Sequence, residues 1–410
     1  MDQRKLYKTI ETIASRKFDS INDMLIEVLN QIVDKEEITV TGGRIWKLNQ
    51  DLKNYRIVYQ TGNVDKINPE FVLKIEDYPI FDQIAKDRTI LGNETNEILR
   101  SIGIFRYSAS GVGDKIKLND KPYYEYLIAL NSDEINEEFR ITLNIIATAI
   151  TAQIKQRKIS ASANSLKADL DKARELQKSI LPEHEYNYFN FNLFGVTHPA
   201  EIVGGDFFDY LEFGEDKDRL GVTVGDAASK GVSASAEAMY ISGALRMACN
   251  FEIKITPLMK RMNTLVNKIF ADDKFASLFY GEISTDKSGL FLYANAGHNP
   301  PYFVRQNSKE IIPLNPTGPV LGPTTQAKYT VENINFQIGD VLLIYSDGVI
   351  DSADSKFEAY GEERLKERLE KSKHLSSKEI TYSILEDVLK FSNNGKYADD
   401  KTIVVIKRVK

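Results

Sequence analysis

The spacing of apolar residues over positions 1–160 predicts a small module of helices and strands. Between Ile21 and Ile32 these residues recur every three or four positions, which is typical of an amphipathic helix. Positions 38–49, 55–62, 102–111 and 123–130 have strand-like patterns, and a short helix is expected at 80–86. A second long helical pattern covers positions 135–159. This order of elements predicts an α+β module.

Positions 155–181 predict a helical connection to the second half of the chain. Apolar residues continue there mostly at spacings of three and four, and the segment has no proline before Pro182, where the helix is expected to stop. The seam comprises Leu166, Leu170, Ala173 and Ile180. A connecting helix with an apolar seam is a candidate coiled coil, so a homodimer formed through it is one expectation. The alternative is a single helix that packs on its own domain.

The second half combines many short strands with long helices. Strands are expected at 189–197, 220–224, 276–283, 289–294, 329–334, 341–345 and 402–406. Helices are expected at 233–250, 257–270 and 376–391. This combination predicts two packed sheets flanked by helices.

Aspartates stand at the ends of several of these predicted strands. The set comprises Asp206, Asp226, Asp347 and the pair Asp399-Asp400. Carboxylate oxygens are ligands that Mg²⁺ and Mn²⁺ prefer. An aspartate beside glycine is also common turn chemistry, so each residue alone is explained by a turn. The set as a whole predicts a site for hard divalent cations.

Eight short motifs in the second half stand in the order found in one enzyme family. They are Leu181-Pro182, Pro199-Ala200 with Val203 to Asp206, Gly225-Asp226 with Lys230 to Val232, Ala296 to Pro300, Gly339-Asp340, Ser346 to Val349, Gly361 with Glu363 to Leu365, and Asp399 to Thr402. With these motifs, residues 183–410 resemble a PPM-type protein serine/threonine phosphatase of the SpoIIE/RsbU branch. The resemblance implies an α-β-β-α sandwich with two Mn²⁺ or Mg²⁺ ions at one end of the sheets.

The resemblance also implies a role for each aspartate. Asp226 would bridge the two ions, helped by the carbonyl of Ala227, and Asp206 would hold one ion. Asp347 and one of the pair Asp399-Asp400 would hold the other ion. We favour Asp399 and leave Asp400 as the alternative. Ala228 replaces a small polar residue common in relatives, but no proposed ligand is missing.

Such a site hydrolyses phosphate esters without a protein nucleophile, because the ions activate water and neutralise the phosphoryl oxygens. This agrees with the single cysteine, Cys249, which lacks the arginine six positions later that a cysteine phosphatase needs and is expected in a helix core. His298 is a candidate general acid, although a role in shaping its loop is the more common one for such a histidine. Lys230 is either a phosphate contact or a solvated lysine.

The order of elements over residues 15–155 resembles a GAF domain, which implies a sensor for a small ligand or a regulatory partner. No Cys or His cluster is present there, which argues against a haem or metal sensor, and the ligand is unknown. Trp46 is expected in the core. The expected domains are therefore a sensor at 1–155, a helical linker at 156–182 and a phosphatase at 183–410.

Composition narrows the expected partners and location. The chain has 410 residues and a net charge of −6, so neither nucleic acid nor an anionic membrane is an expected partner. One cysteine, no signal peptide and no long apolar run predict a cytoplasmic protein. By resemblance, the substrate is a phosphorylated partner-switching protein, such as a STAS-type anti-sigma-factor antagonist. Two rival hypotheses are a non-catalytic scaffold and another two-metal enzyme, such as a nucleotide cyclase.

Overall fold

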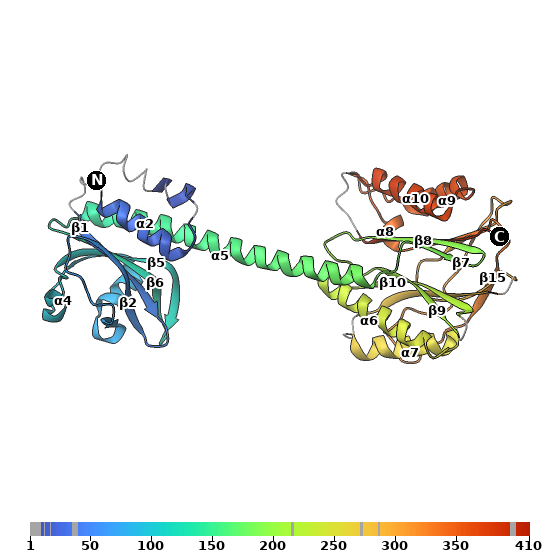
Figure 1. Cartoon of the computed structure of the whole chain (residues 1–410), viewed down its shortest axis with the longest axis horizontal. Coiled ribbons are helices and arrows are strands. Elements are labelled where there is room, and N and C mark those ends of the chain that lie inside the picture. The colour runs from blue at the N-terminus through green and yellow to red at the C-terminus, as the bar shows by residue number, and fades with distance from the viewer. Residues whose placement is uncertain are drawn as a thin grey trace. The chain divides into compact units, whose positions relative to one another are not determined.

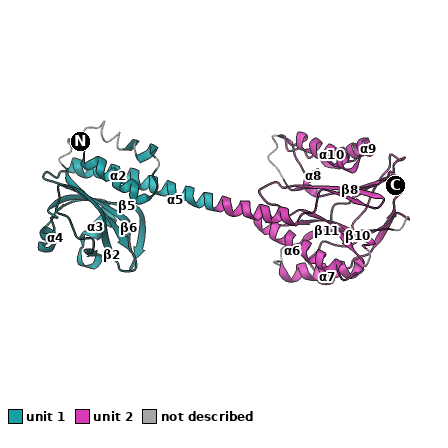
Figure 2. Cartoon of the chain, in the orientation of Figure 1, with its two compact units in different colours: residues 1–165 teal, residues 166–410 magenta. Residues whose placement is uncertain are grey.

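The computed structural model describes residues 10–11, 13–16, 18–34, 40–214, 217–270, 274–285, 288–393 and 399–410. The chain forms two compact units that divide between residues 165 and 166 (Figure 2). The division falls within helix α5 (Glu137–Ile180), one continuous helix of 44 residues that covers both helical patterns predicted on either side of position 155. The domain boundaries expected at 155 and 182 stay predictions.

Unit 1 is built on a six-stranded antiparallel sheet with the order β3-β2-β1-β6-β5-β4 (Figure 1). The strands are β1 (Val40–Asn49), β2 (Asn54–Gly62), β3 (Val72–Lys74), β4 (Thr89–Asn93), β5 (Arg106–Leu118) and β6 (Lys121–Ser132). The helices are α2 (Ile21–Val33), the 3-10 turn η1 (Ile75–Asp77), α3 (Ile80–Asp87) and α4 (Glu97–Ser101).

The sheet of unit 1 separates two apolar cores. On one face, α2 and the first turns of α5 bury residues such as Leu29 and Ile146 against Ile128. On the other face, α3 and α4 pack against Trp46 and Leu127, so the prediction that Trp46 lies in the core is confirmed. The strand predicted from position 102 begins only at Arg106, because α4 and a left-handed turn at Gly103 (φ 77°) come first.

Unit 2 contains two antiparallel sheets with the orders β15-β12-β11-β10-β9 and β14-β13-β16-β17-β8-β7. The first sheet contains β9 (Phe207–Phe213), β10 (Arg219–Ala227), β11 (Ala276–Ser284), β12 (Leu290–Ala296) and β15 (Glu332–Asn335). The second contains β7 (Glu185–Tyr188), β8 (Phe191–His198), β13 (Tyr302–Val304), β14 (Ile311–Pro313), β16 (Val341–Tyr345) and β17 (Lys401–Arg408). The helices are α6 (Gly231–Cys249), α7 (Ile255–Ile269), α8 (Asp347–Ile350), α9 (Gly361–Ser372) and α10 (Ser377–Phe391).

The two sheets of unit 2 pack face to face, with helices on both outer faces (Figure 1). The core between the sheets includes Phe208, Val222, Phe279, Ile344 and Val404. Helices α6 and α7 cover the first sheet, and α9 and α10 cover the second. The mixed α+β class is therefore confirmed, and the layers of unit 2 are helix, sheet, sheet, helix.

In the parts of the chain that the structure describes, no helix combines the length and the apolar character that crossing a bilayer requires.

Candidate active site

The aspartates singled out in the sequence lie at the ends of strands from both sheets of unit 2. Asp206 directly precedes β9, and Asp226 is the penultimate residue of the neighbouring β10. In the other sheet, Asp347 begins α8 just after β16, and Asp399-Asp400 precede β17. Because β16 pairs with β17, Asp347 is brought beside the Asp399-Asp400 pair.

Asp400 joins the two sheets by binding the backbone of the loop that carries Asp206. Its Oδ1 accepts a hydrogen bond from the Ala200 N–H at 2.8 Å, and its Oδ2 accepts from the N–H groups of Gly205 at 2.6 Å and Asp206 at 3.4 Å. Gly204 makes room for this carboxylate, because a Cβ at that position would collide with it. The carboxylate of Asp400 is thus used to hold the loop 200–206 in place.

Asp399 makes different contacts. Its Oδ1 accepts from the Asp400 N–H at 3.0 Å, and its Oδ2 lies 3.7 Å from Nζ of Lys230, which precedes α6. The Lys230 side chain is 71% exposed. Since both carboxylate oxygens of Asp400 accept hydrogen bonds from the loop backbone, we keep Asp399 as the expected cation ligand of the pair.

The hydroxyl of Ser346 fixes the geometry between β16 and β17. The Thr402 N–H donates to Ser346 Oγ at 2.9 Å, and Ser346 Oγ donates to the Asp400 carbonyl at 3.2 Å. Gly348 is required beside them, because a Cβ there would strike that same carbonyl. The start of α8, with Asp347, is therefore held directly against the Asp399-Asp400 pair.

The carboxylates raise one another's pKa. Burial raises the pKa of Asp206 well above its usual value, and the charges of Asp226 and Asp400 add to the effect. Burial, followed by the charges of Asp347, Asp399 and Asp400, raises the pKa of Asp226 to about 7. The pKa of Asp347 is raised by burial and then by Asp399. These groups face one another with too little positive charge to compensate them.

The donor chemistry of this cluster fits a hard divalent cation. Its side-chain donors are carboxylate oxygens, and Asp206 Oδ2 is buried without a hydrogen-bond partner. Ala227 ends β10 next to Asp226, so its carbonyl belongs to the same region. Among the described residues, no three His, Cys, Asp or Glu side chains converge closely enough to enclose an ion as they stand. The roles of Asp206, Asp226, Ala227, Asp347 and Asp399 as ligands stay predictions.

A glutamine near the end of α5 also contacts the loop that carries Asp206. Gln177 Nε2 donates to the Gly204 carbonyl at 2.7 Å, and Gln177 Oε1 accepts from the Gly204 N–H at 3.2 Å. The glutamine side chain is buried. Gln177 was not predicted as a site residue from the sequence, because it lies within the predicted linker. The only sign of its role in the sequence was that a polar residue stands at seam spacing, between Ala173 and Ile180.

His298 and Cys249 lie in the interior. The His298 ring is buried, its Nδ1 lies 2.8 Å from Ser277 Oγ, and burial lowers its pKa to about 4. Its N–H donates to Asn295 Oδ1 at 2.8 Å, as expected for a histidine that shapes its loop. Cys249 is buried at the end of α6, which confirms its place in the helix core.

Comparison with known proteins identifies this region. Residues 216–409 match the family model described as "Stage II sporulation protein E (SpoIIE)". This part of the chain is a SpoIIE-type phosphatase domain. Asp226, Asp347 and Asp399 lie within the matched residues of the SpoIIE-type domain, and Asp206 lies before them. The matched residues do not extend to unit 1, so its GAF-like assignment stays a prediction.

Two curated relatives are homologous over a longer stretch. Protein IcfG of Synechocystis sp. is 28% identical over 320 residues, which are 69% of this chain and 48% of IcfG. This chain thus spans about half the length of IcfG. Phosphoserine phosphatase RsbU of Bacillus subtilis is 24% identical over 245 residues, which are 59% of this chain and 71% of RsbU.

A solved structure shows the same fold. The SiaA-PP2C domain of Pseudomonas aeruginosa aligns with a TM-score of 0.52 and 18% identity, and the alignment covers 60% of this chain and 99% of that domain. The SpoIIE-type domain therefore has a PP2C-like fold.

Proposed function

We propose that this chain is a metal-dependent protein phosphoserine/phosphothreonine phosphatase whose activity is controlled by unit 1. The observation that carries the proposal is that Asp226, from one sheet, lies within electrostatic range of Asp347 and Asp399, from the other. Burial, and then the charges of these neighbours, raise the pKa of Asp226 to about 7. Homology to phosphoserine phosphatase RsbU supports the same reaction.

The residues at this site would have separate roles. Asp206, Asp226, Asp347 and Asp399 would hold two Mn²⁺ or Mg²⁺ ions, with help from the Ala227 carbonyl. The ions, when bound, would supply charge neutralisation for the phosphoryl group and a water activated near neutral pH. Asp400 and Gln177 would keep the loop 200–206 in position. Lys230 stands beside Asp399, where its ammonium can meet an incoming phosphate.

The proposed substrate is a phosphorylated partner-switching protein of the STAS-type anti-sigma-factor antagonist class. The resemblance to the SpoIIE/RsbU branch and the homology to RsbU support this class. The scaffold hypothesis would be favoured by a missing ligand, and all proposed ligands are present. The single buried thiol of Cys249 is compatible with a cytoplasmic location.

The test is hydrolysis of a phosphoserine peptide and of p-nitrophenyl phosphate by the full chain with Mn²⁺, with Mg²⁺ and with EDTA. We expect turnover that requires the metal and falls by at least about 100-fold in Asp226→Asn, because a bridging ligand is lost. Glu386→Gln, which removes an exposed carboxylate of α10 paired with Lys390, is the matched control and should keep full activity.

Two results would contradict the proposal. One is turnover that persists in EDTA. The other is a folded chain that binds Mn²⁺ by calorimetry yet hydrolyses neither substrate, which would favour the scaffold hypothesis.

A further inference from the structure

A short hairpin at residues 352–360 follows α8 at the candidate active site. Ser352, at its base, donates through Oγ to the Gly348 carbonyl at 2.7 Å, which attaches the hairpin to the helix that begins with Asp347. The Tyr360 N–H donates to the Ser352 carbonyl at 2.7 Å. Ser352 and Tyr360 are both buried, so the base of the hairpin is fixed to the interior of unit 2.

Hydrogen bonds also fix the tip of this hairpin. Asp354 Oδ1 accepts from the Lys356 N–H at 2.8 Å and from the Glu358 N–H at 3.0 Å. The Phe357 N–H donates to the Asp354 carbonyl at 3.1 Å, and the Asp354 N–H donates to the Glu358 carbonyl at 3.0 Å. The tip therefore holds the backbone of Phe357 in one defined conformation.

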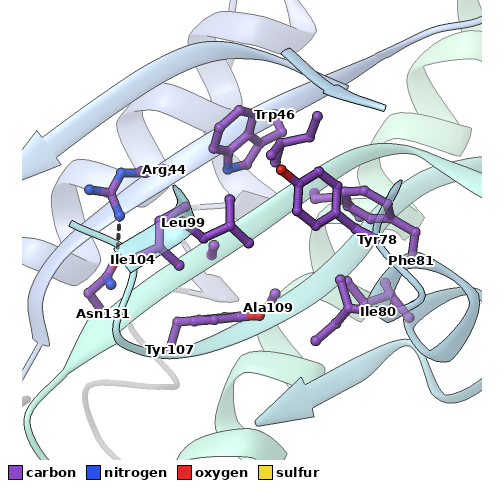
Figure 3. Close-up of a pocket in the computed structure, with 14 residues that line it drawn as sticks. Arg44, Trp46, Tyr78, Ile80, Phe81, Leu99, Ile104, Tyr107, Ala109 and Asn131 are labelled. Carbon is purple, nitrogen blue, oxygen red and sulfur yellow. Dashed lines mark hydrogen bonds between the residues drawn. The ribbon is translucent and has the colours of Figure 1, made fainter. Parts of the chain in front are cut away.

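Phe357 is unfavourable at this position in two respects. Its φ of 64° lies in the left-handed region, which glycine and asparagine adopt more easily than an aromatic residue. The residue is also 68% exposed. In unit 1, by contrast, Trp46, Phe81 and Tyr107 are buried between the sheet and the helices α3 and α4 (Figure 3). A strained backbone conformation with an exposed ring points to a function for the side chain.

The hairpin lies at the open side of the candidate active site. Asp351, the residue before the hairpin, reaches solvent. Its pKa is raised by partial burial and then by the charge of Asp399, so the two carboxylates are neighbours. The exposed ammonium of Lys230 also lies near Asp399. From Asp351 to the turn is three residues of the hairpin, or roughly 10 Å at about 3.3 Å per residue.

We propose that Phe357 is a docking residue for the substrate protein, and that this substrate carries an apolar side chain three or four residues from its phosphoserine. The proposal rests on the phosphatase function proposed above and specifies its substrate. An extended segment covers the roughly 10 Å between the site and the hairpin tip with three or four residues.

The two ends of such a segment would make different contacts. The phosphate would lie at the proposed metal site beside Lys230, where its charge is opposite to that of the ammonium. The apolar side chain would pack on the ring of Phe357 and remove apolar surface of both partners from water. Aromatic residues, phenylalanine included, are enriched in the buried centre of protein interfaces.

The experiment compares two phosphoserine peptides with p-nitrophenyl phosphate on the full chain with Mn²⁺. One peptide carries leucine at the third and fourth positions on both sides of the phosphoserine, and the other carries serine there. We expect kcat/KM for the leucine peptide to exceed that for the serine peptide by at least about tenfold, because the ring of Phe357 is covered. p-Nitrophenyl phosphate is too small to reach the hairpin tip from the site, so its turnover is the internal reference.

Three variants identify the side chain responsible. Phe357→Asn should reduce the preference for the leucine peptide to less than about twofold without lowering thermal stability, because asparagine tolerates the left-handed conformation. A purely structural role for the ring would lower stability and leave the preference intact. Phe357→Tyr should keep the preference.

Phe189→Asn is the matched control. Phe189 is also 68% exposed and has a φ of 47°. It precedes the end of β8 that pairs with Arg408, whereas the other end of β8 pairs with Lys401, next to Asp400. The same substitution at this distance from the aspartates should leave the preference for the leucine peptide unchanged.

Two outcomes would overturn the proposal. They are equal kcat/KM values for the two peptides on the unmodified chain and an unchanged preference in Phe357→Asn. Failure of the proposed phosphatase function is a different result, in which no chain hydrolyses any of the three substrates. Fluorescence polarisation of the labelled peptides on the Asp226→Asn chain, where hydrolysis is expected to be impaired, then measures the preference as binding. Equal affinities of that chain for the two peptides would likewise overturn the proposal.

Discussion

Asp399 and Asp400 are adjacent and have the same side chain, but we expect them to have different roles. The difference lies in their contacts with backbone N–H groups. Asp400 accepts three backbone N–H groups from the loop 200–206. Asp399 instead lies near Lys230 and shifts the pKa of both Asp226 and Asp347 upward. We therefore expect removal of the charge to affect metal-dependent turnover at Asp399 and stability of the fold at Asp400.

Asp399→Asn should lower metal-dependent turnover by at least about 100-fold with little change in thermal stability, because it removes a proposed ligand. Asp400→Asn should instead destabilise the fold by about 1–3 kcal/mol, since charge-assisted hydrogen bonds to the loop are weakened. Calorimetric Mn²⁺ titration and thermal unfolding of both variants separate the two effects. Loss of Mn²⁺ binding in Asp400→Asn alone would reverse the assignment.

His298 gives a prediction for the pH dependence of stability. Its pKa is lowered to about 4 in the folded chain, against 6.5 for an ordinary histidine. The unfolded chain therefore binds the extra proton between these values, and stability is lost as the pH falls through this window. We expect this histidine alone to cost about 2 kcal/mol between pH 7 and pH 5.

The measurement compares urea unfolding at both pH values for the unmodified chain, His298→Gln and the control His374→Gln, which replaces an exposed histidine. Comparing differences between chains cancels the titration of the aspartates. An equal loss of stability in the unmodified chain and in His298→Gln would show that the histidine is not buried in its neutral form.

At the scale of elements, the contact between α5 and the loop 200–206 links the long helix to the site. Gln177→Leu would leave the N–H and the carbonyl of Gly204 without their partner. This would destabilise the ordered conformation of the loop 200–206 by about 1–3 kcal/mol. We expect a roughly tenfold lower kcat and weaker Mn²⁺ binding. Gln156→Leu, at an exposed glutamine of the same helix, is the matched control.

A purely structural role for Gln177 would give a different result. Thermal stability would then fall while kcat and Mn²⁺ affinity stayed unchanged. Calorimetry and steady-state kinetics on the same preparations decide between the two roles.

The sequence predicted most long elements of unit 2 because their periodicity is strong. The helix expected at 376–391 corresponds to α10, which begins with a capping box formed by Ser376 and Glu379. Short elements were missed, including β3, β13 and β14, because three residues are too few to show a period. Helix α9 was also missed, because its sequence is dominated by charged residues and only Leu365 and Leu369 are apolar core residues.

For the candidate site, the sequence located the aspartates but not the groups that orient them. Glycine beside aspartate at strand ends is a local signal that can be read from neighbouring positions. The contacts of Asp400 with Ala200 and of Gln177 with Gly204 join residues 200 and 27 positions apart. No periodicity encodes such contacts, so only the fold reveals them.

At the scale of the whole molecule, exposed apolar residues on α5 predict association of two chains. Ile159, Leu166 and Leu176 are each more than 60% exposed, so the described part of the chain does not bury these apolar side chains. Ile159, Leu166 and Ala173 are spaced by seven, as in a coiled coil. We therefore expect a homodimer formed through this helix.

The double variant Ile159→Glu with Leu166→Glu should convert the dimer to a monomer, because like charges would face each other across the seam. Sedimentation velocity over a range of concentrations measures this. The control places glutamate at the exposed positions Ser160 and Lys167 of the same helix. A chain that is monomeric without any substitution would exclude the dimer.

The hydrogen bond between the Ala200 N–H and the Asp400 carboxylate also has a consequence for biosynthesis. The two residues are 200 positions apart, and β8, which pairs with β7 on one side, finds its other neighbour in β17. At about 5–20 residues per second, a ribosome needs roughly 10–40 s to make the chain between them. During that interval the loop with Asp206 has no carboxylate to hold it, and the second sheet lacks its central strand. We therefore expect a nascent chain to lack the proposed phosphatase activity until the segment from Asp399 to Arg408 has been translated.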